Sequence, residues 1–150
     1  MTSMTNAGIT TAGAACVMCE KYGRSDGLLH IVDLALSRVF LHEDQFFPGY
    51  VLLVLRRHVT ELYALPAPER ATLMEEMSRV AQALAQVFRP VKMNYELLGN
   101  LVPHIHWHLV PRLATDPALH SPIWTVEHQA VAPPPVAARE RIESIRRALA

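Results

Sequence analysis

The stretch His-Ile-His-Trp-His-Leu-Val at residues 104–110 is the most informative part of this sequence. Polar and apolar residues alternate along it, which is typical of a β-strand whose successive side chains point to opposite faces. The three histidines, His104, His106 and His108, are therefore predicted to share one face, while the apolar residues between them pack on the core. Neighbours on such a face lie about 6.5–7 Å apart, a spacing that suits one small substrate or one ion.

Two kinds of chemistry use a face of this type. In the first, the histidines hold a catalytic metal ion that keeps one coordination position open for water. In the second, a neutral imidazole attacks phosphorus and forms a covalent intermediate, while its neighbours stabilise charge on the phosphoryl oxygens. A single histidine is more often a structural residue, but packing alone poorly explains three at a strict period of two. The spacing leaves both chemistries open.

The clearest helix precedes this strand, between Pro66 and Pro90. Proline is tolerated in the first turn of a helix, and the residue before a proline disfavours helical dihedral angles, so the two prolines mark its ends. Apolar residues recur at spacings of three and four and form one stripe. The stripe consists of Leu73, Met77, Val80, Leu84 and Val87. We expect it to pack against the apolar face of the strand at 104–110.

Shorter apolar runs predict the remaining elements. Strands are expected at residues 28–32, 37–41, 50–55 and 92–98, and a second amphipathic helix at 136–149. This order predicts an α+β fold with an antiparallel sheet of about five strands and two main helices. Residues 1–15 lack periodicity and are expected to be a flexible N-terminal segment, with residues 16–150 forming a single domain.

Composition narrows the possible partners. The 150 residues include 14 Lys and Arg against 14 Asp and Glu, so the formal net charge is zero. A protein that holds a nucleic acid polymer by neutralising phosphates needs a surplus of basic residues. The longest apolar run, at 50–55, falls far short of the roughly 20 residues that a membrane helix requires. The first 15 residues do not read as a secretory signal. We therefore expect a soluble cytoplasmic protein without nucleic acid or membrane partners.

The sequence around the histidines resembles the histidine triad (HIT) family of nucleotide hydrolases and transferases. Residues 104–110 fit its His-x-His-x-His-x-x signature, in which x is apolar. Asn94, Gly99 and the residues up to Arg112 keep the order of the strand–turn–strand that forms the family's phosphate site. Residues 53–58, Leu-Val-Leu-Arg-Arg-His, resemble a strand of the family that ends in a basic pair and a histidine. The similarity is strongest to bacterial members described as diadenosine tetraphosphate hydrolase-like.

This resemblance implies a role for each residue of the triad. His106 would attack the α-phosphorus of a nucleotide and form a nucleotidyl-histidine intermediate, which water then hydrolyses. His108 would donate to the phosphate or the leaving group, and His104 would orient His106, partly through its backbone carbonyl. The transferase branch of the superfamily has Gln in place of the third histidine, so His108 favours hydrolysis of a phosphoanhydride or phosphoramidate bond. The family fold also implies a homodimer.

The resemblance also implies nucleotide-binding residues. Asp44 lies about where the family has a ribose-binding acidic residue, and Asn94, Gly99 and Asn100 belong to the phosphate region. Many family members carry Gly-Gln-Ser or Gly-Gln-Thr before the triad, whereas this chain has Gly99-Asn100-Leu101. Asn100 can still donate a hydrogen bond, but Leu101 has no hydroxyl group. The preferred leaving group is therefore expected to differ from that of better-known members.

Cys16 and Cys19 are the only cysteines in the chain. Their Cys-x-x-Cys spacing fits a metal pair, a redox pair or two buried thiols. Together with His58 and His104 they would make a Cys2His2 set, which suits a structural zinc ion. Several HIT proteins hold zinc at the matching positions, so the resemblance implies structural zinc here and no organic cofactor.

The remaining histidines, His30, His42, His120 and His128, have no partner at useful spacing and are expected at surface or loop positions. Arg112 follows a proline after the triad and fits either a structural role or the site. Two other functions remain open. One is a metal-dependent hydrolase with His104, His106 and His108 as ligands, which a chelator would inactivate. The other is a nucleotide-binding protein without catalysis.

Overall fold

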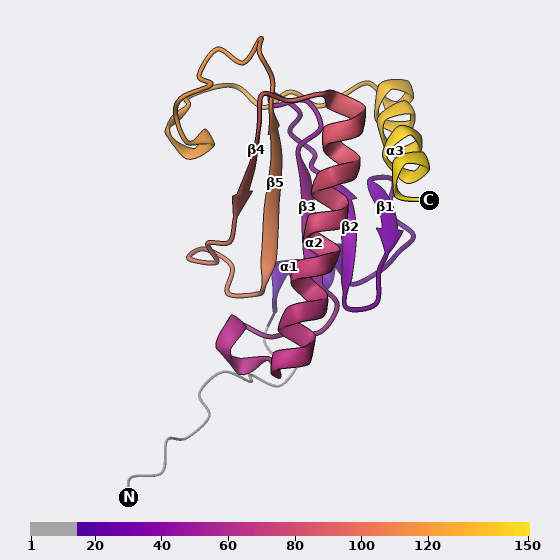
Figure 1. Ribbon diagram of the computed structural model, residues 1–150, viewed down its shortest axis with the longest axis vertical. Helices are drawn as coiled ribbons and strands as arrows, with labels where there is room; N and C mark the ends of the chain where they lie inside the picture. Colours follow the sequence, from indigo (N-terminus) through magenta and orange to yellow (C-terminus); the bar gives the residue numbers. More distant parts are fainter. Residues whose placement is uncertain (1–14) are drawn as a thin grey trace, which may run out of the picture.

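A computed structural model describes residues 15–150 of the chain, and its centre is one antiparallel sheet with the strand order β1-β2-β3-β5-β4 (Figure 1). The strands are β1 (His30–Asp33), β2 (Ser37–Leu41), β3 (Val51–Leu55), β4 (Lys92–Glu96) and β5 (His106–Arg112). The helices are α1 (Val17–Tyr22), α2 (Ala67–Phe88) and α3 (Pro135–Leu149), with short 3-10 turns at Leu62–Ala64 and Ile123–Thr125. The predicted five-stranded antiparallel sheet with two main helices is confirmed.

Helix α2 covers one face of the sheet (Figure 1). It begins directly after Pro66 and ends at Phe88, because Arg89 adopts a left-handed conformation with φ of 49° before Pro90. Four of the five residues of the predicted stripe are buried, namely Leu73, Met77, Val80 and Leu84. They form one core cluster with Ile105, Trp107 and Leu109, to which α3 adds Ala138, Ile142 and Ile145. The expected packing of the helix stripe on the apolar face of the triad strand is therefore confirmed.

The triad strand begins two residues later than the sequence pattern predicts. The ladder with β3 starts where Val54 pairs with His106. His104 lies just before it, although Ile105 still accepts a hydrogen bond from the Leu55 amide and donates one to the Val59 carbonyl. The chain leaves the sheet here because β3 ends at Leu55, so no strand partner extends to His104.

A second, smaller core lies on the opposite face of the sheet. The short helix α1 packs there through Met18 and Tyr22, together with Phe40, Leu52 and Val110. Ile123, from the C-terminal part of the chain, completes this cluster. A helix of six residues is too short to produce a periodic signal in the sequence. The histidine side of β5 therefore faces a layer built from α1 and from the segment around Ile123.

One expectation remains outside what the structure tests. The predicted flexible segment at residues 1–15 lies outside the described residues except for its last position. Among residues 15–150, no helix is long and apolar enough to cross a membrane.

Candidate active site

His106 and His108 lie side by side on β5, with ring centroids 4.8 Å apart and an angle of 69° between the rings. Both side chains belong to buried residues, with 4% and 9% of their surface exposed. His106 Nδ1 lies 2.6 Å from the backbone carbonyl oxygen of His104. A carbonyl oxygen only accepts, so Nδ1 carries the proton and Nε2 keeps its lone pair. This is the form of imidazole that can attack an electrophilic phosphorus.

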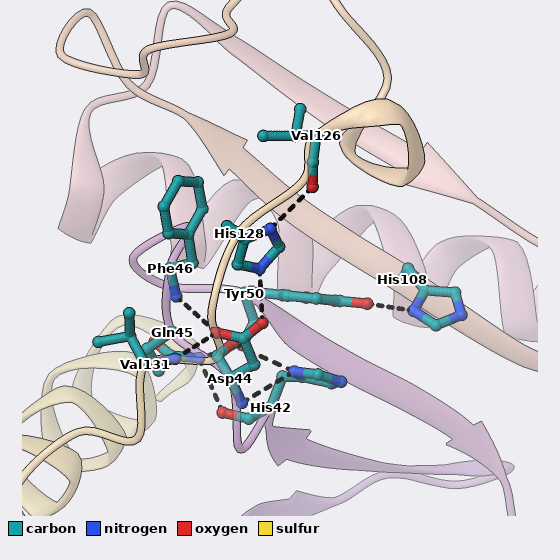
Figure 2. Close-up of polar contacts among 9 residues, drawn as sticks. All are labelled: His42, Asp44, Gln45, Phe46, Tyr50, His108, Val126, His128 and Val131. Atoms are coloured by element: carbon teal, nitrogen blue, oxygen red, sulfur yellow. Dashed lines mark hydrogen bonds and ion pairs between the residues drawn. The ribbon is translucent and has the colours of Figure 1, made fainter.

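His108 carries its proton on the other nitrogen. Its Nδ1 lies 2.5 Å from the Tyr50 hydroxyl (Figure 2). Burial raises the pKa of Tyr50, so the phenol stays protonated and can donate a hydrogen bond to Nδ1, and on this basis we assign the ring proton of His108 to Nε2. Burial, reinforced by the positive charge that His106 and His42 would carry, lowers the pKa of His108 to about 3. His108 is therefore a neutral ring whose Nε2–H is available as a hydrogen-bond donor.

His104 faces a different group of residues, the two cysteines and His58. Its Nδ1 lies 3.6 Å from Cys16 Sγ, 3.5 Å from Cys19 Sγ and 3.3 Å from His58 Nδ1. Cys19 Sγ is also 3.5 Å from His58 Nδ1, and the four ligand atoms all lie within 4.8 Å of one another. The structure thus brings together all four residues that are predicted from the sequence as metal ligands.

These separations can be compared with those around a zinc ion. Zinc binds nitrogen at about 2.0–2.1 Å and thiolate sulfur at about 2.3 Å. In a tetrahedron of those bond lengths, two nitrogens lie about 3.3 Å apart, and a nitrogen and a sulfur about 3.5 Å apart. The measured distances agree with both values. His104 Nε2 also donates to the Leu55 carbonyl at 2.8 Å, which leaves Nδ1 unprotonated toward the cluster.

Helix α1 positions the two cysteines. Cys16 precedes its first residue and Cys19 lies three residues later, so both thiols project from the same side of one turn. Met18 and Tyr22 anchor that turn in the second core cluster. The His104 side chain faces the cysteines while its carbonyl holds His106, so one residue links the two sites.

Asp44 lies in the loop between β2 and β3, and its carboxylate is held by backbone and side-chain donors (Figure 2). Oδ1 accepts from the amides of Phe46 at 3.0 Å and Val131 at 2.9 Å, and Oδ2 lies 2.8 Å from His128 Nε2. Burial alone would raise the pKa of Asp44, but these hydrogen bonds outweigh it and the net shift is downward. Asp44 is therefore a firmly ionised carboxylate, with 20% of its side chain exposed.

A cavity of about 160 Å³ runs between Asp44 and the triad. It is lined by His42, Asp44, Phe47, Tyr50, His108, Ile123, Trp124 and His128. His42 stacks on Tyr50 with ring centroids 4.1 Å apart and planes within 9°, and Trp124 meets His108 edge-on at 4.9 Å. The cavity is thus partly aromatic, and it is lined by one anionic group, the Asp44 carboxylate, and by one buried hydrogen-bond donor, the His108 ring.

The other predicted nucleotide-binding residues lie on the opposite side of β5. Asn94, on β4, pairs with Val110 and accepts a hydrogen bond from Arg112 Nη1 at 2.7 Å. Gly99 and Asn100 lie in the loop between β4 and β5, where Gly99 has φ of +79°, a conformation that favours glycine. Asn100 is exposed, and Leu101 is 97% exposed. This loop is thus open to solvent beside the triad strand.

Six of the eight cavity residues were missed by sequence reasoning, namely His42, Phe47, Tyr50, Ile123, Trp124 and His128. His42 and His128 lie in loops, as predicted, but His42 stacks on Tyr50 and His128 pairs with Asp44, partners that the sequence does not reveal. The predicted surface or loop position is wrong for His30, which is the first residue of β1. His30 is likewise paired, with Asp33 at 2.8 Å. Tyr50 contacts His108, which is 58 positions away in the chain, and His128 contacts Asp44, which is 84 positions away. No local sequence pattern indicates such contacts.

This fold and this histidine face define a class of α+β protein with an imidazole pair on a central strand. The HIT domain profile matches residues 29–115, and the chain therefore belongs to the HIT domain family. Among solved structures it resembles a histidine triad protein from Bradyrhizobium japonicum, with a TM-score of 0.75, 37% identity and coverage of 81% of this chain and 90% of that one. A Zn-bound histidine triad family protein from Mycobacterium smegmatis shares the fold, with a TM-score of 0.66, 22% identity and coverage of 90% and 93%.

Two curated relatives carry the names of enzymes. An asymmetrical bis(5'-nucleosyl)-tetraphosphatase from Schizosaccharomyces pombe is 31% identical over 86 residues, which are 54% of this chain and 47% of the relative. Adenosine 5'-monophosphoramidase HNT1 from Saccharomyces cerevisiae is 23% identical over 103 residues, 68% of this chain and 65% of the relative. The chain therefore spans less than two thirds of the length of each.

Proposed function

We propose that this protein is a nucleotide hydrolase that cleaves a phosphoanhydride or phosphoramidate bond at the α-phosphate. The observation that carries the proposal is the pair of contacts that hold the two imidazoles of β5, from which opposite tautomers are assigned. His106 keeps a free Nε2 because the His104 carbonyl takes its Nδ1 proton, while His108 keeps a proton on Nε2 because Tyr50 donates to its Nδ1. A nucleophile and a hydrogen-bond donor are thus fixed next to each other. The curated relatives named as a tetraphosphatase and a phosphoramidase support the same chemistry.

The proposed reaction has two steps. His106 Nε2 attacks the α-phosphorus, so that an N–P bond forms while the bond to the leaving group breaks. A phosphate leaving group departs as an anion, and an amine takes its proton from solvent. Water then attacks the same phosphorus, the N–P bond breaks, and a nucleoside monophosphate leaves with release of a proton to solvent. His108 Nε2–H donates a hydrogen bond to the developing phosphoryl charge.

Substrate contacts are proposed for four further residues. Asp44 lines the cavity beside His108 and is an ionised acceptor suited to ribose hydroxyls. Asn94, Gly99 and Asn100 flank the phosphate region of the triad strand, where Asn100 is exposed and has an amide to donate. We also propose that residues 16–150 act as one cytoplasmic HIT-type domain that forms a homodimer.

The test of the proposed function is a substrate panel with adenosine 5'-phosphoramidate, diadenosine tetraphosphate and an aminoacyl-adenylate. Wild-type protein is expected to release AMP from at least one of them. The variant His106→Ala should lose turnover by at least about 10³-fold while keeping the wild-type circular dichroism spectrum. Wild-type protein denatured during turnover at alkaline pH, where an N–P bond survives, should carry AMP on His106 by peptide mass spectrometry. Turnover that survives in His106→Ala would overturn the proposal.

The alternative of a catalytic metal held by all three triad histidines is less well supported. His104 Nδ1 faces the cysteines and its Nε2 is bonded to Leu55, so neither nitrogen is free to share an ion with His106. This alternative predicts that a chelator abolishes turnover within the time needed to strip a labile ion. The nucleophile mechanism predicts that brief chelation leaves turnover unchanged.

Zinc is proposed as a structural cofactor held by Cys16, Cys19, His58 and His104. The support is the agreement of the four measured separations with tetrahedral zinc and the orientation of His104 Nδ1 toward them. When bound, zinc supplies a structural cross-link between α1 and the start of β5. His104 would then hold His106 through its carbonyl with little freedom of movement.

Elemental analysis of the purified protein tests the zinc site. Wild type is expected to carry about one zinc per chain, and the double variant Cys16→Ser/Cys19→Ser none. The double variant should also unfold at a lower temperature, since bound metal stabilises only the folded state. A double variant that keeps its zinc would refute the assignment of these ligands.

A further inference from the structure

The cavity beside His108 is lined in part by a segment that lies outside the matched HIT residues 29–115. Three of its eight lining residues, Ile123, Trp124 and His128, come from this C-terminal segment. Ile123 is buried in the core cluster on the histidine side of the sheet, which anchors the segment there. The segment is therefore part of the packed structure around the site.

His128 is bonded at both ring nitrogens to acceptors. Nδ1 donates to the Val126 carbonyl at 2.9 Å, and Nε2 donates to Asp44 Oδ2 at 2.8 Å. Since both nitrogens donate, the ring is an imidazolium in this arrangement, and the same two contacts raise its pKa. The ring also stacks on Phe46, with centroids 4.0 Å apart. Figure 2 shows His128 lying directly over the Asp44 carboxylate.

The Val131 amide donates to the second oxygen of the same carboxylate. Among residues 15–150, two of the three hydrogen bonds to the Asp44 carboxylate thus come from the C-terminal segment, and the third comes from Phe46 in the loop of Asp44 itself. A carboxylate oxygen accepts more than one hydrogen bond, so Asp44 can bind a hydroxyl group while it remains held. Asp44 is the acidic residue that lines the cavity. The C-terminal segment therefore helps to orient the Asp44 carboxylate toward a ligand in the cavity.

Trp124 contributes the aromatic wall. It is 52% exposed, meets His108 edge-on and donates its indole N–H to Glu96 of β4. A cavity of about 160 Å³ is smaller than the usual 300–1,000 Å³ of a site for a whole ligand, so it fits one part of a substrate. An ionised acceptor at Asp44, a flat aromatic side and His108 at the phosphoryl end together suit a nucleoside.

We propose that Trp124 and His128 determine substrate specificity, with Trp124 contacting the nucleoside and His128 positioning Asp44 for the ribose hydroxyls. This inference rests on the proposed hydrolase function and extends it to residues beyond the matched domain. It predicts that discrimination between ribose and dideoxyribose substrates depends on His128, which lies 84 positions after Asp44 in the chain.

Fluorescence tests the role of Trp124. The chain has two tryptophans, and Trp107 is buried in the α2 core with 8% exposure. AMP is expected to change the emission of the wild-type protein, and Trp124→Phe should abolish that change while calorimetry still detects AMP binding. A change that persists in Trp124→Phe, or calorimetric AMP binding to wild type without any change in emission, would refute the contact.

Kinetics test the role of His128. For His128→Ala, KM for adenosine 5'-phosphoramidate should rise about tenfold, as expected for one weakened hydrogen bond to a charged group. KM for the 2',3'-dideoxy analogue should change less than twofold, because that substrate has no ribose hydroxyl for Asp44. His120→Ala is the matched control, since His120 is exposed in the same region and does not line the cavity.

The outcomes separate the inference from the function on which it rests. An equal rise in KM for both substrates would show that His128 only maintains the fold, and would overturn the inference while the hydrolase function stands. If wild-type protein neither binds AMP nor turns over any substrate in the panel, the hydrolase function and the inference fail together.

Discussion

Two hydrogen bonds of different origin determine which ring nitrogen carries the proton in His106 and in His108. The bond that orients His106 is local, because its acceptor is the backbone carbonyl two residues earlier on the same segment. The bond that orients His108 comes from Tyr50, just before β3, and depends on the register between β3 and β5. The nucleophile is thus oriented by its own segment, whereas its neighbour is oriented by the assembled sheet.

The variant Tyr50→Phe tests this arrangement at the scale of one atom. Loss of the hydroxyl leaves Nδ1 of a buried ring without its donor, which costs about 1–3 kcal/mol and allows the ring to change tautomer. We expect kcat to fall about tenfold, with His106 still able to form the nucleotidyl adduct. Nitrogen NMR should report the Nε2–H tautomer of His108 in wild type and a mixture in the variant.

Tyr63→Phe provides the control for this substitution, because Tyr63 is 76% exposed in the 3-10 turn before α2. It should leave both the kinetics and the NMR spectrum unchanged. If Tyr50→Phe also retains the wild-type kcat and a pure Nε2–H tautomer, Tyr50 does not position His108.

At the scale of elements, Arg112 joins the end of β5 to the loop that follows it. Its side chain is almost fully buried and donates to Asp116 at 2.5 Å, to Asn94, and to the carbonyls of Ala118 and Ser121 at 2.5 and 2.8 Å. The guanidinium is therefore occupied by the protein, and its role is structural. The loop it holds leads directly to the segment that contains Trp124 and His128.

The variant Arg112→Ala should therefore destabilise the fold strongly. It leaves Asp116 as a buried carboxylate without its ion-pair partner, and breaking such a pair costs about 3–5 kcal/mol. Urea unfolding measures this loss of free energy, with the exposed Arg139→Ala as the control. A variant with wild-type stability and no activity would instead place Arg112 in the chemistry.

At the scale of the whole molecule, buried neutral histidines make stability depend on pH. Burial lowers the pKa of His42 and that of His108, the latter to about 3. Both rings take up protons in the unfolded chain near pH 6.5, while the folded protein resists protonation until lower pH. The free energy of unfolding should therefore decrease as pH falls below about 6.5. The pKa of His128 is raised, so His128 contributes in the opposite direction. Its contribution to the free energy of unfolding is fully present below about pH 6.5 and is lost as pH rises through its raised pKa in the folded protein.

The pH dependence can be measured as the urea midpoint between pH 7.5 and 5. For wild type we expect a loss of the order of 1 kcal/mol per pH unit from His108 alone below pH 6.5. His108→Gln should have a shallower dependence, and the difference between the two curves isolates His108 from other titrating groups. Parallel curves would show that His108 titrates normally in the folded protein.

The sheet also has an edge available for assembly. Strand β4 is the last strand in the order, and apolar residues near it are exposed, namely Val91, Tyr95 and Leu98 at 62%, 45% and 55%. Unpaired strand edges beside apolar side chains favour pairing with another strand. We expect a second copy of the chain to dock along β4.

Light scattering should then give about twice the chain mass of 16.8 kDa. Tyr95→Glu is expected to shift the protein toward monomer. Leu28→Glu should have no effect, because Leu28 is 95% exposed next to β1 at the opposite edge of the sheet. A wild-type monomer, or a dimer that is insensitive to Tyr95→Glu, would exclude this interface.

Much of the fold follows from local patterns that the sequence displays directly. The alternation at residues 104–110 and the stripe of α2 determine which side chains enter the main core, and both match the structure. The prolines at residues 66 and 90 bound α2 because proline's effects on dihedral angles are local. The HIT signature likewise lies within seven consecutive residues.

The surroundings of the histidines depend on contacts that no local pattern contains. Tyr50 reaches His108 through strand pairing, and His128 reaches Asp44 only after the chain has folded back over the sheet. Cys16 and Cys19 meet His104 because α1 packs under the histidine face. The sequence by itself determined the five strands, the two main helices and the core that they share, since these rest on residues a few positions apart. Only the tertiary structure decided the tautomer of His108 and the walls of the cavity, because hydrogen bonds between distant residues depend on the assembled fold.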